Sequence, residues 1–316
     1  MKKILVTGGA GFIGSSFVKH SIRKGYEVIV VDKLTYAGDL ERLKEVEGKY
    51  KFHKADICDK RRVELIFKNE KPQNVVHFAA ESHVDRSIKD ATFFIKTNVE
   101  GTHFLLSISR KYRIKKFLHI STDEVYGNIK KGKFFENFPL KPNSPYSASK
   151  ASADLFVRAY IKTYGFPAII IRPCNNYGPW QYPEKLIPLA LLQILKNKKI
   201  LVYGDGKNKR EWIYVDDCTE GIFKIMEKGK IGEVYNLGSG EEKQNIEVVK
   251  DLLRIFNKKE TSMEFVTDRL GHDFRYALNT DKIRKEINWQ AGVKFKDGFK
   301  RTIDWFIVNK DWILNK

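Results

Sequence analysis

Short apolar runs alternate with segments of helical periodicity through the first half of the chain. The runs lie at residues 3–7, 27–32, 51–55, 74–79, 117–121 and 168–172. Between them, apolar residues recur at helical spacing at about residues 12–24, 60–69, 92–111 and 148–163. This alternation predicts an α/β fold, with a doubly wound parallel sheet covered by helices on both faces.

The alternation becomes less regular after about residue 177. Pro179, Pro183 and Pro188 interrupt the chain there, and strands and helices then follow without a fixed order. We therefore predict two domains. Residues 1–177 form the sheet domain, and residues 178–316 form a smaller, mixed α/β domain that mainly binds substrate, with some segments threading back onto the first domain.

The first apolar run ends in the glycine-rich stretch Gly8-Gly9-Ala10-Gly11-Phe12-Ile13-Gly14. Glycines between a strand and a helix let the backbone approach a pyrophosphate, which the helix N-terminus then binds. Asp32 ends the second run, where a carboxylate hydrogen-bonds the ribose hydroxyls and repels a 2′-phosphate. The first domain is therefore predicted to be a Rossmann domain that binds NAD rather than NADP, with Asp56 and Ile57 beside the adenine ring.

Tyr146 and Lys150 form a Tyr-x-x-x-Lys motif at the start of a predicted helix. The spacing of four places both side chains on one helix face. An ammonium near a phenol is expected to lower the phenol pKa, so that Tyr146 can accept a proton from a substrate hydroxyl.

Two adjacent carboxylates, Asp123 and Glu124, follow the strand expected at residues 117–121 and come directly after Thr122. They therefore lie at the carboxyl edge of the sheet, where open α/β folds bind ligands. A dehydrogenase or epimerase needs only the Tyr–Lys pair, whereas an elimination also needs an acid and a base. His77 and His119 lie inside apolar runs, and we expect both to be packed in the core.

Together these residues resemble the extended short-chain dehydrogenase/reductase superfamily, over essentially the whole chain. The Ser121–Gly127 stretch is similar to that of the dTDP-glucose 4,6-dehydratases, as are the segments 32–38, 79–87, 175–179, 183–188, 204–206, 210–212 and 268–276. Trp180 departs from the pattern, because the resemblance leads us to expect tyrosine there.

The resemblance implies the residues that hold each ligand. The cofactor NAD would contact Gly8, Gly11, Phe12, Ile13, Gly14, Asp32, Lys33, Leu34, Thr35, Asp56, Ile57, Phe78, Ala79, Ala80, Ser82, Thr97, Tyr146, Lys150 and Asn176. The substrate, dTDP-glucose, would contact His83, Thr122, Asn175, Lys185, Leu186, Leu201, Tyr203, Arg210, Asn245, Arg269, His272 and Tyr276. No metal ion is expected.

The resemblance also implies catalytic roles. Tyr146 takes the proton of the sugar 4-hydroxyl as C4 is oxidised, Lys150 supports the phenolate, and Thr122 hydrogen-bonds the same oxygen. Glu124 then removes the C5 proton, and Asp123 protonates the leaving 6-hydroxyl. For this, the pKa of Asp123 has to be raised, which burial beside Glu124 would achieve.

Other activities stay open at this point. A UDP-glucose 4,6-dehydratase shares the Asp-Glu pair, whereas an epimerase lacks it and a UDP-glucuronate decarboxylase typically has serine in place of Asp123. A non-catalytic NAD-binding protein on the same fold is a further alternative. The net charge of +19 would suit nucleic acid, but the lysines are spread along the whole chain and we expect no such partner.

Assembly and location follow from composition and the same resemblance. The helices at 92–111 and 148–163 carry apolar residues beyond what one sheet face needs, among them Leu155, Phe156, Ala159 and Tyr160, which favours a homodimer. No apolar run reaches 18 residues, so no membrane span is expected. Three scattered cysteines suit a cytoplasmic protein.

Overall fold

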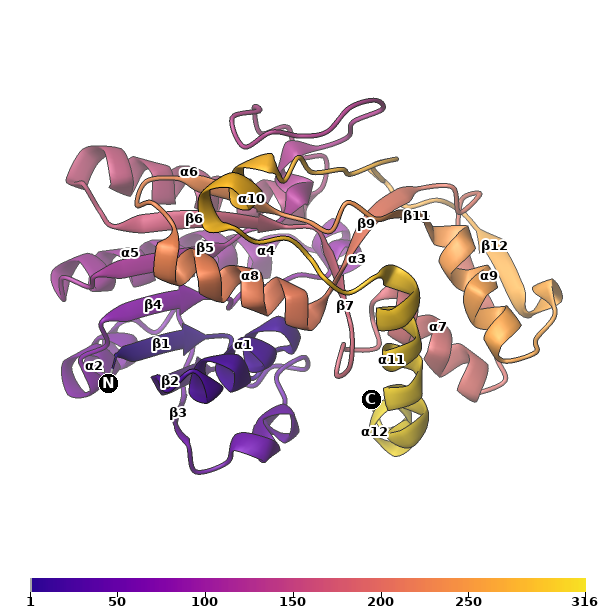
Figure 1. Cartoon of the computed structure of the whole chain (residues 1–316), viewed down its shortest axis with the longest axis horizontal. Helices are drawn as coiled ribbons and strands as arrows, with labels where there is room; N and C mark the ends of the chain where they lie inside the picture. The colour runs from indigo at the N-terminus through magenta and orange to yellow at the C-terminus, as the bar shows by residue number, and fades with distance from the viewer. Residues whose placement is uncertain (1) are drawn as a thin grey trace.

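The computed structural model describes residues 2–316, and its centre is a seven-stranded parallel sheet (Figure 1). The strand order is β10-β6-β5-β4-β1-β2-β3, and all neighbouring strands run parallel. The strands are β1 (Lys3–Thr7), β2 (Glu27–Asp32), β3 (Tyr50–Lys54), β4 (Asn74–His77), β5 (Lys116–Ile120), β6 (Ala168–Pro173) and β10 (Val234–Leu237). The order reverses between β1 and β4, as in Rossmann folds, and the predicted fold class is confirmed.

Helices cover both faces of this sheet because side chains alternate along each strand. On β1, Ile4 and Val6 pack in one core cluster with Phe17, whereas Leu5 packs in another with Phe67. The first face is covered by α1 (Phe12–Arg23) and α8 (Val215–Lys228). The second is covered by α2 (Lys60–Glu70), α5 (Thr102–Lys111) and α6 (Pro145–Tyr164).

Three elements differ from their predicted bounds for local reasons. The strand expected at 74–79 ends at His77, because Phe78 and Ala79 already line the cavity described below. Helix α6 begins at Pro145 rather than 148, since Ser144 caps it through a capping box and proline occupies its first position. The helix expected at 92–111 comprises α4 (Thr92–Phe94), a π-helical segment (Ile95–Gly101) and α5.

The second half of the chain has an apolar core of its own and contains two small sheets. One sheet has the order β11-β9-β7, and the other pairs β12 with β8. Its strands are β7 (Asn175–Tyr177), β8 (Ile200–Tyr203), β9 (Lys209–Tyr214), β11 (Glu242–Gln244) and β12 (Met263–Val266). Its helices, besides α8, are α7 (Leu186–Leu195), α9 (Asn245–Ile255), α10 (Asp281–Ile287), α11 (Phe295–Val308) and α12 (Lys310–Leu314).

Two elements of this second half lie against the first. Strand β10 pairs with β6 in the large sheet, and α8 packs on α1. The division of the chain at residue 177 stays a prediction. The remaining short elements are α3 (Val84–Lys89) and 3₁₀ helices at Leu40–Val46, Asp123–Tyr126 and Glu260–Ser262.

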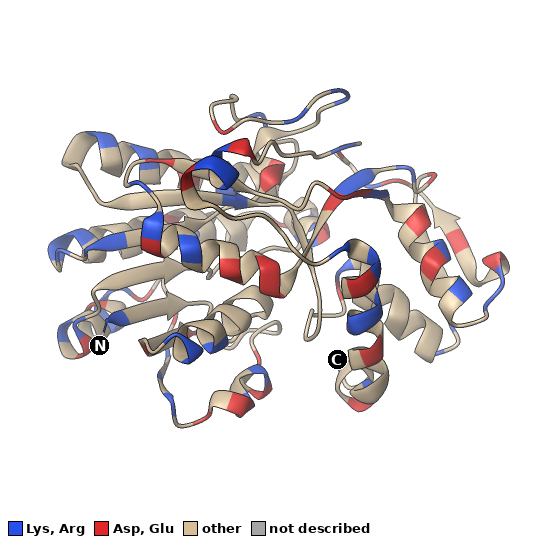
Figure 2. Cartoon of the chain, viewed as in Figure 1, with Lys and Arg blue, Asp and Glu red and all other residues tan. Residues whose placement is uncertain are grey.

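Charged residues of both signs occur on helices and loops throughout the chain (Figure 2). Within residues 2–316, no helix is both long enough and apolar enough to cross a membrane.

A buried ion pair joins helix α6 to strand β6 of the large sheet. Asp154 of α6 accepts a hydrogen bond from Arg172 of β6 at 2.9 Å, and both side chains are almost fully excluded from solvent. His119 lies 3.4 Å from the same carboxylate, and His77 hydrogen-bonds Thr7, so both histidines are packed in the core as expected. Burial alone would raise the pKa of Asp154, but Arg172 and the other polar neighbours outweigh it and hold that pKa below its ordinary value.

We predict that Asp154→Ala lowers the free energy of unfolding by about 3–5 kcal/mol, because Arg172 would remain buried without its partner. Asp304→Ala removes an exposed partner of Lys300 and should cost less than about 0.5 kcal/mol. Because the pKa of Asp154 is depressed in the folded protein, its stabilisation is present above the unfolded pKa of about 4 and is lost as the pH falls further. Urea unfolding at several pH values measures both effects, and equal losses for the two variants at neutral pH would contradict the prediction.

Candidate active site

A cavity of about 710 Å³ opens at the carboxyl edge of the large sheet and extends to the second half of the chain. Every site residue predicted from the sequence lines it except Leu34, whose backbone N–H instead donates to Asp32 at 2.8 Å. The structure therefore brings together segments that lie as far apart in the sequence as Gly8 and Tyr276.

The glycine-rich loop forms one end of the cavity. Gly8 has a φ of +69°, and a Cβ atom there would lie 2.6 Å from the backbone nitrogen of Ala79. A Cβ atom at Gly14 would lie 2.2 Å from the carbonyl oxygen of Gly8. Gly11 precedes α1 without a side-chain cap, so the first N–H groups of this helix are available to an anion.

Asp32 lies beside this loop at the end of β2. Its carboxylate accepts hydrogen bonds from the backbone of Ala10 at 3.0 Å and of Leu34. Burial raises the pKa of Asp32 above its ordinary value, although these hydrogen bonds and Arg42 act in the opposite direction. Lys33 forms an ion pair with Asp56 at 2.7 Å at the same end. The glycine-rich loop lets its backbone approach a dinucleotide closely, and Asp32 beside it can accept hydrogen bonds from ribose hydroxyls, so this end of the cavity fits NAD.

The π-helical segment places two neighbouring side chains differently. Thr97 lines the cavity, whereas the buried Asn98 bonds the backbone of Glu81 through both its oxygen and its nitrogen. Asn98 also donates to Ser149 of α6 at 2.8 Å. π-Helical turns of this kind are frequent at functional sites, and here the turn ties the cavity wall to the helix that carries Tyr146.

Tyr146 and Lys150 lie one turn apart near the start of α6, and both are buried. Lys150 donates to the carbonyl oxygen of Ile120 at 2.7 Å. Burial lowers the pKa of Lys150 to about 8, although Asp154 acts in the opposite direction.

The expectation that Lys150 lowers the pKa of Tyr146 is wrong for this structure. Burial and the charge of Glu124 raise that pKa well above its ordinary value, and a hydrogen bond with Thr122 offsets only part of the shift. The reason is geometric, because the ammonium of Lys150 is bonded to the Ile120 carbonyl while two carboxylates lie near the phenol.

Asp123 and Glu124 begin the 3₁₀ helix that follows β5, capped by Thr122. The Thr122 hydroxyl oxygen accepts from the backbone N–H of Glu124 and donates to Asp123, both at 3.3 Å. Asp123 is 1% exposed, and its second carboxylate oxygen has no hydrogen-bond partner within the described residues.

The electrostatics of these two carboxylates meet the requirement stated for an acid. Burial, followed by the charges of Glu124 and Glu211, raises the pKa of Asp123 well above its ordinary value. Burial also raises the pKa of Glu124, against the opposing charges of Arg210, Lys185 and Arg269. A protonated Asp123 at neutral pH is what an elimination requires.

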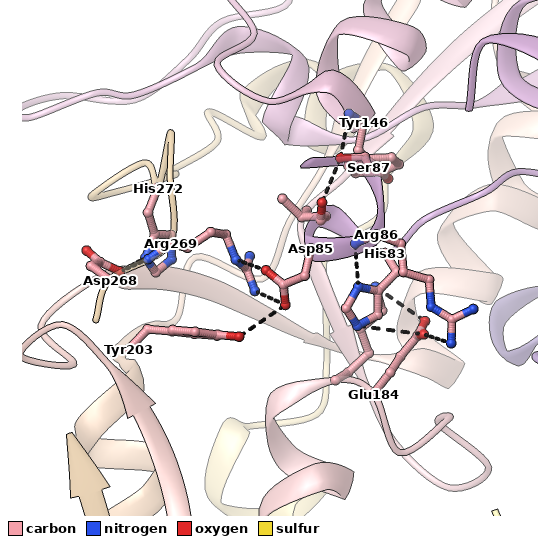
Figure 3. A network of polar contacts seen from close by, with 12 residues as sticks. His83, Asp85, Arg86, Ser87, Tyr146, Glu184, Tyr203, Asp268, Arg269 and His272 are labelled. Carbon is pink, nitrogen blue, oxygen red and sulfur yellow. Dashed lines mark hydrogen bonds and ion pairs between the residues drawn. The ribbon is translucent and has the colours of Figure 1, made fainter. Parts of the chain in front are cut away.

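A network of polar contacts crosses the cavity from α3 to the second half of the chain (Figure 3). Asp85 forms an ion pair with Arg269 Nε at 2.6 Å, and it accepts hydrogen bonds from Arg269 Nη2 at 3.2 Å and from Tyr203 at 3.3 Å. Two residues further along the same helix, Ser87 accepts from the backbone N–H of Tyr146 at 3.1 Å. Helix α3 thus connects the start of α6 with the far wall of the cavity.

The other side of this network centres on Glu184 (Figure 3). His83 and Arg86 approach its carboxylate at 3.8 and 3.9 Å, and Tyr36 donates to it at 3.4 Å. His83 also caps α3, because its ring nitrogen accepts from the backbone of Arg86 at 3.3 Å.

The remaining predicted substrate contacts lie on the far wall. Arg210 is buried, and its guanidinium donates to the carbonyl oxygens of Lys209, Phe274 and Asp273. His272 contacts Asp268 at 2.7 Å. The other predicted substrate contacts that line the cavity are Asn175, Lys185, Leu186, Leu201, Tyr203, Asn245 and Tyr276, and Asn176, predicted to contact the cofactor, lies beside Asn175.

Several lining residues were missed by the sequence analysis. They include Arg42, Glu81, Asp85, Glu184 and Asp273. Asp85 and Glu184 each lie within a segment that was recognised as family-like, so only their individual importance was missed. Arg42 had no local signal, since it occupies an ordinary position in a short polar helix.

This fold, with a Tyr–Lys pair opening a helix next to a dinucleotide cradle, defines the extended short-chain dehydrogenase/reductase class. The buried Asp123 beside the half-buried Glu124 narrows that class to enzymes that also eliminate water. Residues 5–302 match the family model described as GDP-mannose 4,6 dehydratase. The chain belongs to this family, and within it to the group of dTDP-glucose 4,6-dehydratases that its relatives represent.

Three relatives illustrate this similarity. The dTDP-glucose 4,6-dehydratase of Neisseria meningitidis serogroup B is 46% identical over 340 residues, which cover all of this chain and 96% of the relative. DesIV, the dTDP-glucose 4,6-dehydratase of Streptomyces venezuelae, was solved with NAD and TYD bound; it is 45% identical with a TM-score of 0.95, covering 98% of each chain. A UDP-glucose 4-epimerase of Thermotoga maritima, solved with UDP-glucose, is 33% identical with a TM-score of 0.91, covering 98% of this chain and 99% of the epimerase.

We predict that Asp32→Ala weakens NAD binding roughly 10- to 100-fold, because hydrogen bonds to a charged acceptor are lost. The same change should weaken NADP binding less, since the repulsion of a 2′-phosphate also disappears. Isothermal titration with both nucleotides measures the change, and Asp297→Ala on the exposed side of α11 is a suitable control. A wild-type protein that prefers NADP would refute this interpretation of Asp32.

Proposed function

We propose that this protein is an NAD-dependent lyase that converts dTDP-glucose to dTDP-4-keto-6-deoxyglucose and water. The observation that carries the proposal is the buried Asp123, with a strongly raised pKa, next to Glu124 in the same cavity as Tyr146 and Lys150. The relatives described above support the choice of dTDP-glucose over UDP-glucose as substrate.

The glycine-rich loop, Asp32 and the residues near Asp56 would hold the cofactor. When bound, NAD would supply the hydride chemistry that oxidation at C4 and reduction at C6 require, and its nicotinamide ring would add a positive charge to the site. Tyr146 takes the proton of the 4-hydroxyl as C4 is oxidised, and Thr122 bonds the same sugar oxygen. Lys150 keeps a positive charge below a pH of about 8, which stabilises the phenolate that Tyr146 becomes.

The carboxylates carry out the elimination. Oxidation to a 4-ketone acidifies the neighbouring C5–H bond, and Glu124 removes that proton. Asp123 donates its proton to the 6-hydroxyl, so that the C6–O bond breaks and water leaves. With a hydride returned to C6, the proton that Glu124 holds returns to C5 and completes the 4-keto product. Tyr146 then carries the proton of the former 4-hydroxyl and Asp123 lacks the one that left with water, so a net shift of one proton from Tyr146 to Asp123 restores the site.

The far wall of the cavity would bind the nucleotide. Arg210, Arg269 and Lys185 provide positive charge for the diphosphate, and the partly exposed side chains of Leu201 and Tyr203 provide apolar surface for the base. The pair between Arg269 and Asp85 uses the Nε–Nη2 edge of the guanidinium, so Nη1 remains free to bind an anion.

One assay tests the overall proposal. The protein is incubated separately with dTDP-glucose and with UDP-glucose, and the alkali-induced absorbance of a 4-keto-6-deoxy sugar is followed. We expect product from dTDP-glucose, whereas product from UDP-glucose alone would overturn the choice of substrate.

The assigned roles predict two different kinetic defects. Asp123→Asn combined with Glu124→Gln should slow turnover by roughly 10²–10⁴-fold, because acid–base assistance to the elimination is lost. This variant should still oxidise C4. The reduced cofactor should therefore accumulate on the enzyme together with the oxidised sugar, and its near-ultraviolet absorbance should appear. Tyr146→Phe should instead block the appearance of that absorbance, since the hydroxyl proton then has no acceptor.

Rapid mixing of each variant with dTDP-glucose distinguishes the two defects. Normal turnover by the carboxylate variant, or cofactor reduction at the wild-type rate by Tyr146→Phe, would show that the roles are assigned wrongly.

The proposal includes assembly as a homodimer in the cytoplasm. Apolar side chains are exposed on neighbouring helices of one face: Phe93 and Ile95 at 64% and 59%, and Leu155 and Phe156 at 54% and 41%. Burying these side chains against the same face of a second copy would create a symmetric interface. The three cysteines are all free thiols, which supports a reducing compartment.

We predict that Leu155→Lys combined with Phe156→Lys converts the dimer to a monomer, because charges would enter the apolar interface. Leu65→Lys, at a comparably exposed position on α2, should leave the dimer intact. Sedimentation velocity at micromolar concentration measures the outcome. A wild-type monomer under these conditions would contradict the proposed assembly.

A further inference from the structure

Arg42 is a buried cation that the proposed chemistry does not use. It lies in the 3₁₀ helix Leu40–Val46 and is 1% exposed, although it lines the cavity. Within residues 2–316 it forms no ion pair with a carboxylate. Burial lowers the pKa of Arg42 to about 10, which shows that holding this charge away from water has an energetic cost.

The guanidinium of Arg42 binds backbone carbonyls from three separate segments. Its Nη1 donates to the oxygens of Ala10 and Ala37, at 2.9 and 2.6 Å. Its Nε and Nη2 both donate to the oxygen of Trp180, at 3.1 and 3.0 Å. The three carbonyl oxygens satisfy the N–H donors of the guanidinium but do not neutralise its positive charge. Because the guanidinium is planar and rigid, these bonds hold the three backbone segments together at one point.

Each of these segments borders the cofactor end of the cavity. Ala10 lies in the glycine-rich loop, and Ala37 belongs to the loop after Asp32. Trp180 precedes Gln181 and Tyr182, which line the cavity from the second half of the chain. The bonds of Arg42 therefore connect the two sides of the cofactor end across 138 residues of sequence.

The Trp180 segment is held in a conformation that favours this contact. Trp180 has a φ of +70°, which is unusual for a bulky residue. Its ring packs against Trp305 and Trp312, with ring centroids 4.6 and 5.3 Å apart. The tryptophan at this position, where tyrosine was expected, is thus part of an aromatic cluster next to Arg42.

The same cluster reaches back to the loop after Asp32. The indole nitrogen of Trp312 donates to the carboxylate of Asp39 at 2.9 Å, and the Arg42 guanidinium lies 5.6 Å from the Trp312 ring centroid. The backbone N–H of Asp39 in turn donates to Ala10, the residue whose carbonyl Arg42 also binds. Arg42, Trp312, Asp39 and Ala10 are thus connected in a ring of contacts beside the glycine-rich loop.

We propose that Arg42 is a positioning residue that holds the cofactor cradle closed and slows the release of NAD. The inference rests on the proposed function, in which the cofactor is regenerated in each turnover and gains nothing from leaving. Arg42 acts through the loops that it fixes and not through the reacting atoms, so its loss should change cofactor retention far more than the chemical steps.

The test compares Arg42→Met and Arg42→Lys with wild type. NADH is bound to cofactor-depleted protein, and its dissociation is followed by fluorescence after addition of excess NAD. We expect Arg42→Met to raise the dissociation rate of NADH about 10- to 100-fold, because several charge-assisted hydrogen bonds are lost. Arg42→Lys should cause a smaller increase, since one ammonium cannot bridge three carbonyls in the same way.

The turnover number at saturating NAD should stay within about twofold of wild type. Arg23→Met, at an exposed arginine of the adjacent helix α1, is the matched control and should leave dissociation unchanged. If Arg42→Met does not fold, the Arg42→Lys measurement decides the question alone.

Unchanged NADH dissociation in the folded variants would overturn the inference and leave Arg42 with a structural role. Thermal unfolding without cofactor identifies that role, because a purely structural residue would lower the melting temperature without altering release. Failure of the proposed function is observed separately, as a wild-type protein that binds NADH but does not convert dTDP-glucose.

Discussion

Removing Asp123 from water is the constraint on which the chemistry of this site depends. Burial disfavours the charged form of Asp123, and the charges of Glu124 and Glu211 act in the same direction, so together they outweigh the opposing charge of Arg210 and raise the pKa of Asp123. Glu211 is itself fully buried, and it is held by the backbone N–H groups of Gly240 and Leu278. Burial raises the pKa of Glu211 as well, against these backbone donors, whereas the hydrogen-bond donor to Asp123 is the hydroxyl of Thr122.

Both halves of the chain line the cavity, and polar side chains connect them at two places, one near the substrate residues and one near the cofactor residues. At the substrate level, Asp85 binds Arg269 while Ser87 of the same helix fixes the first turn of α6. At the cofactor level, Arg42 joins the glycine-rich loop to Trp180. The apolar core that α8 and β10 share with the first half sets the overall position of the two halves, and these polar contacts then join the walls around the ligands. A site built in this way is specific in geometry but sensitive to the loss of single polar groups.

The sequence predicted those features that depend on local signals. Apolar runs located six of the seven parallel strands to within about two residues but not β10 of the second half, and the glycine spacing with Asp32 located the cofactor loop. The start of α6 was missed by three residues, although Ser144 and Pro145 carry a recognisable capping signal. The π-helical turn had no such signal, because the same apolar periodicity suits an uninterrupted helix.

Contacts between distant segments were not predictable in the same way. Asp85 and Arg269 are 184 residues apart, and Arg42 reaches Trp180 across a similar interval. The direction of the Tyr146 pKa was missed for this reason as well. The expectation considered only Lys150, four residues away on the helix, whereas the structure adds carboxylates from the turn after β5 and gives the ammonium another partner.

The raised pKa of Tyr146 links the two halves of the proposed reaction. The negative charge of Asp123 is one of the influences that raise the pKa of the phenol. When burial keeps Asp123 protonated, that influence disappears, and the phenolate becomes easier to form than it would be beside two ionised carboxylates. In the proposed reaction, the proton on Asp123 would therefore favour formation of the Tyr146 phenolate and would later leave with the 6-hydroxyl. The group proposed as the acid for the elimination would thus also assist the oxidation that precedes it.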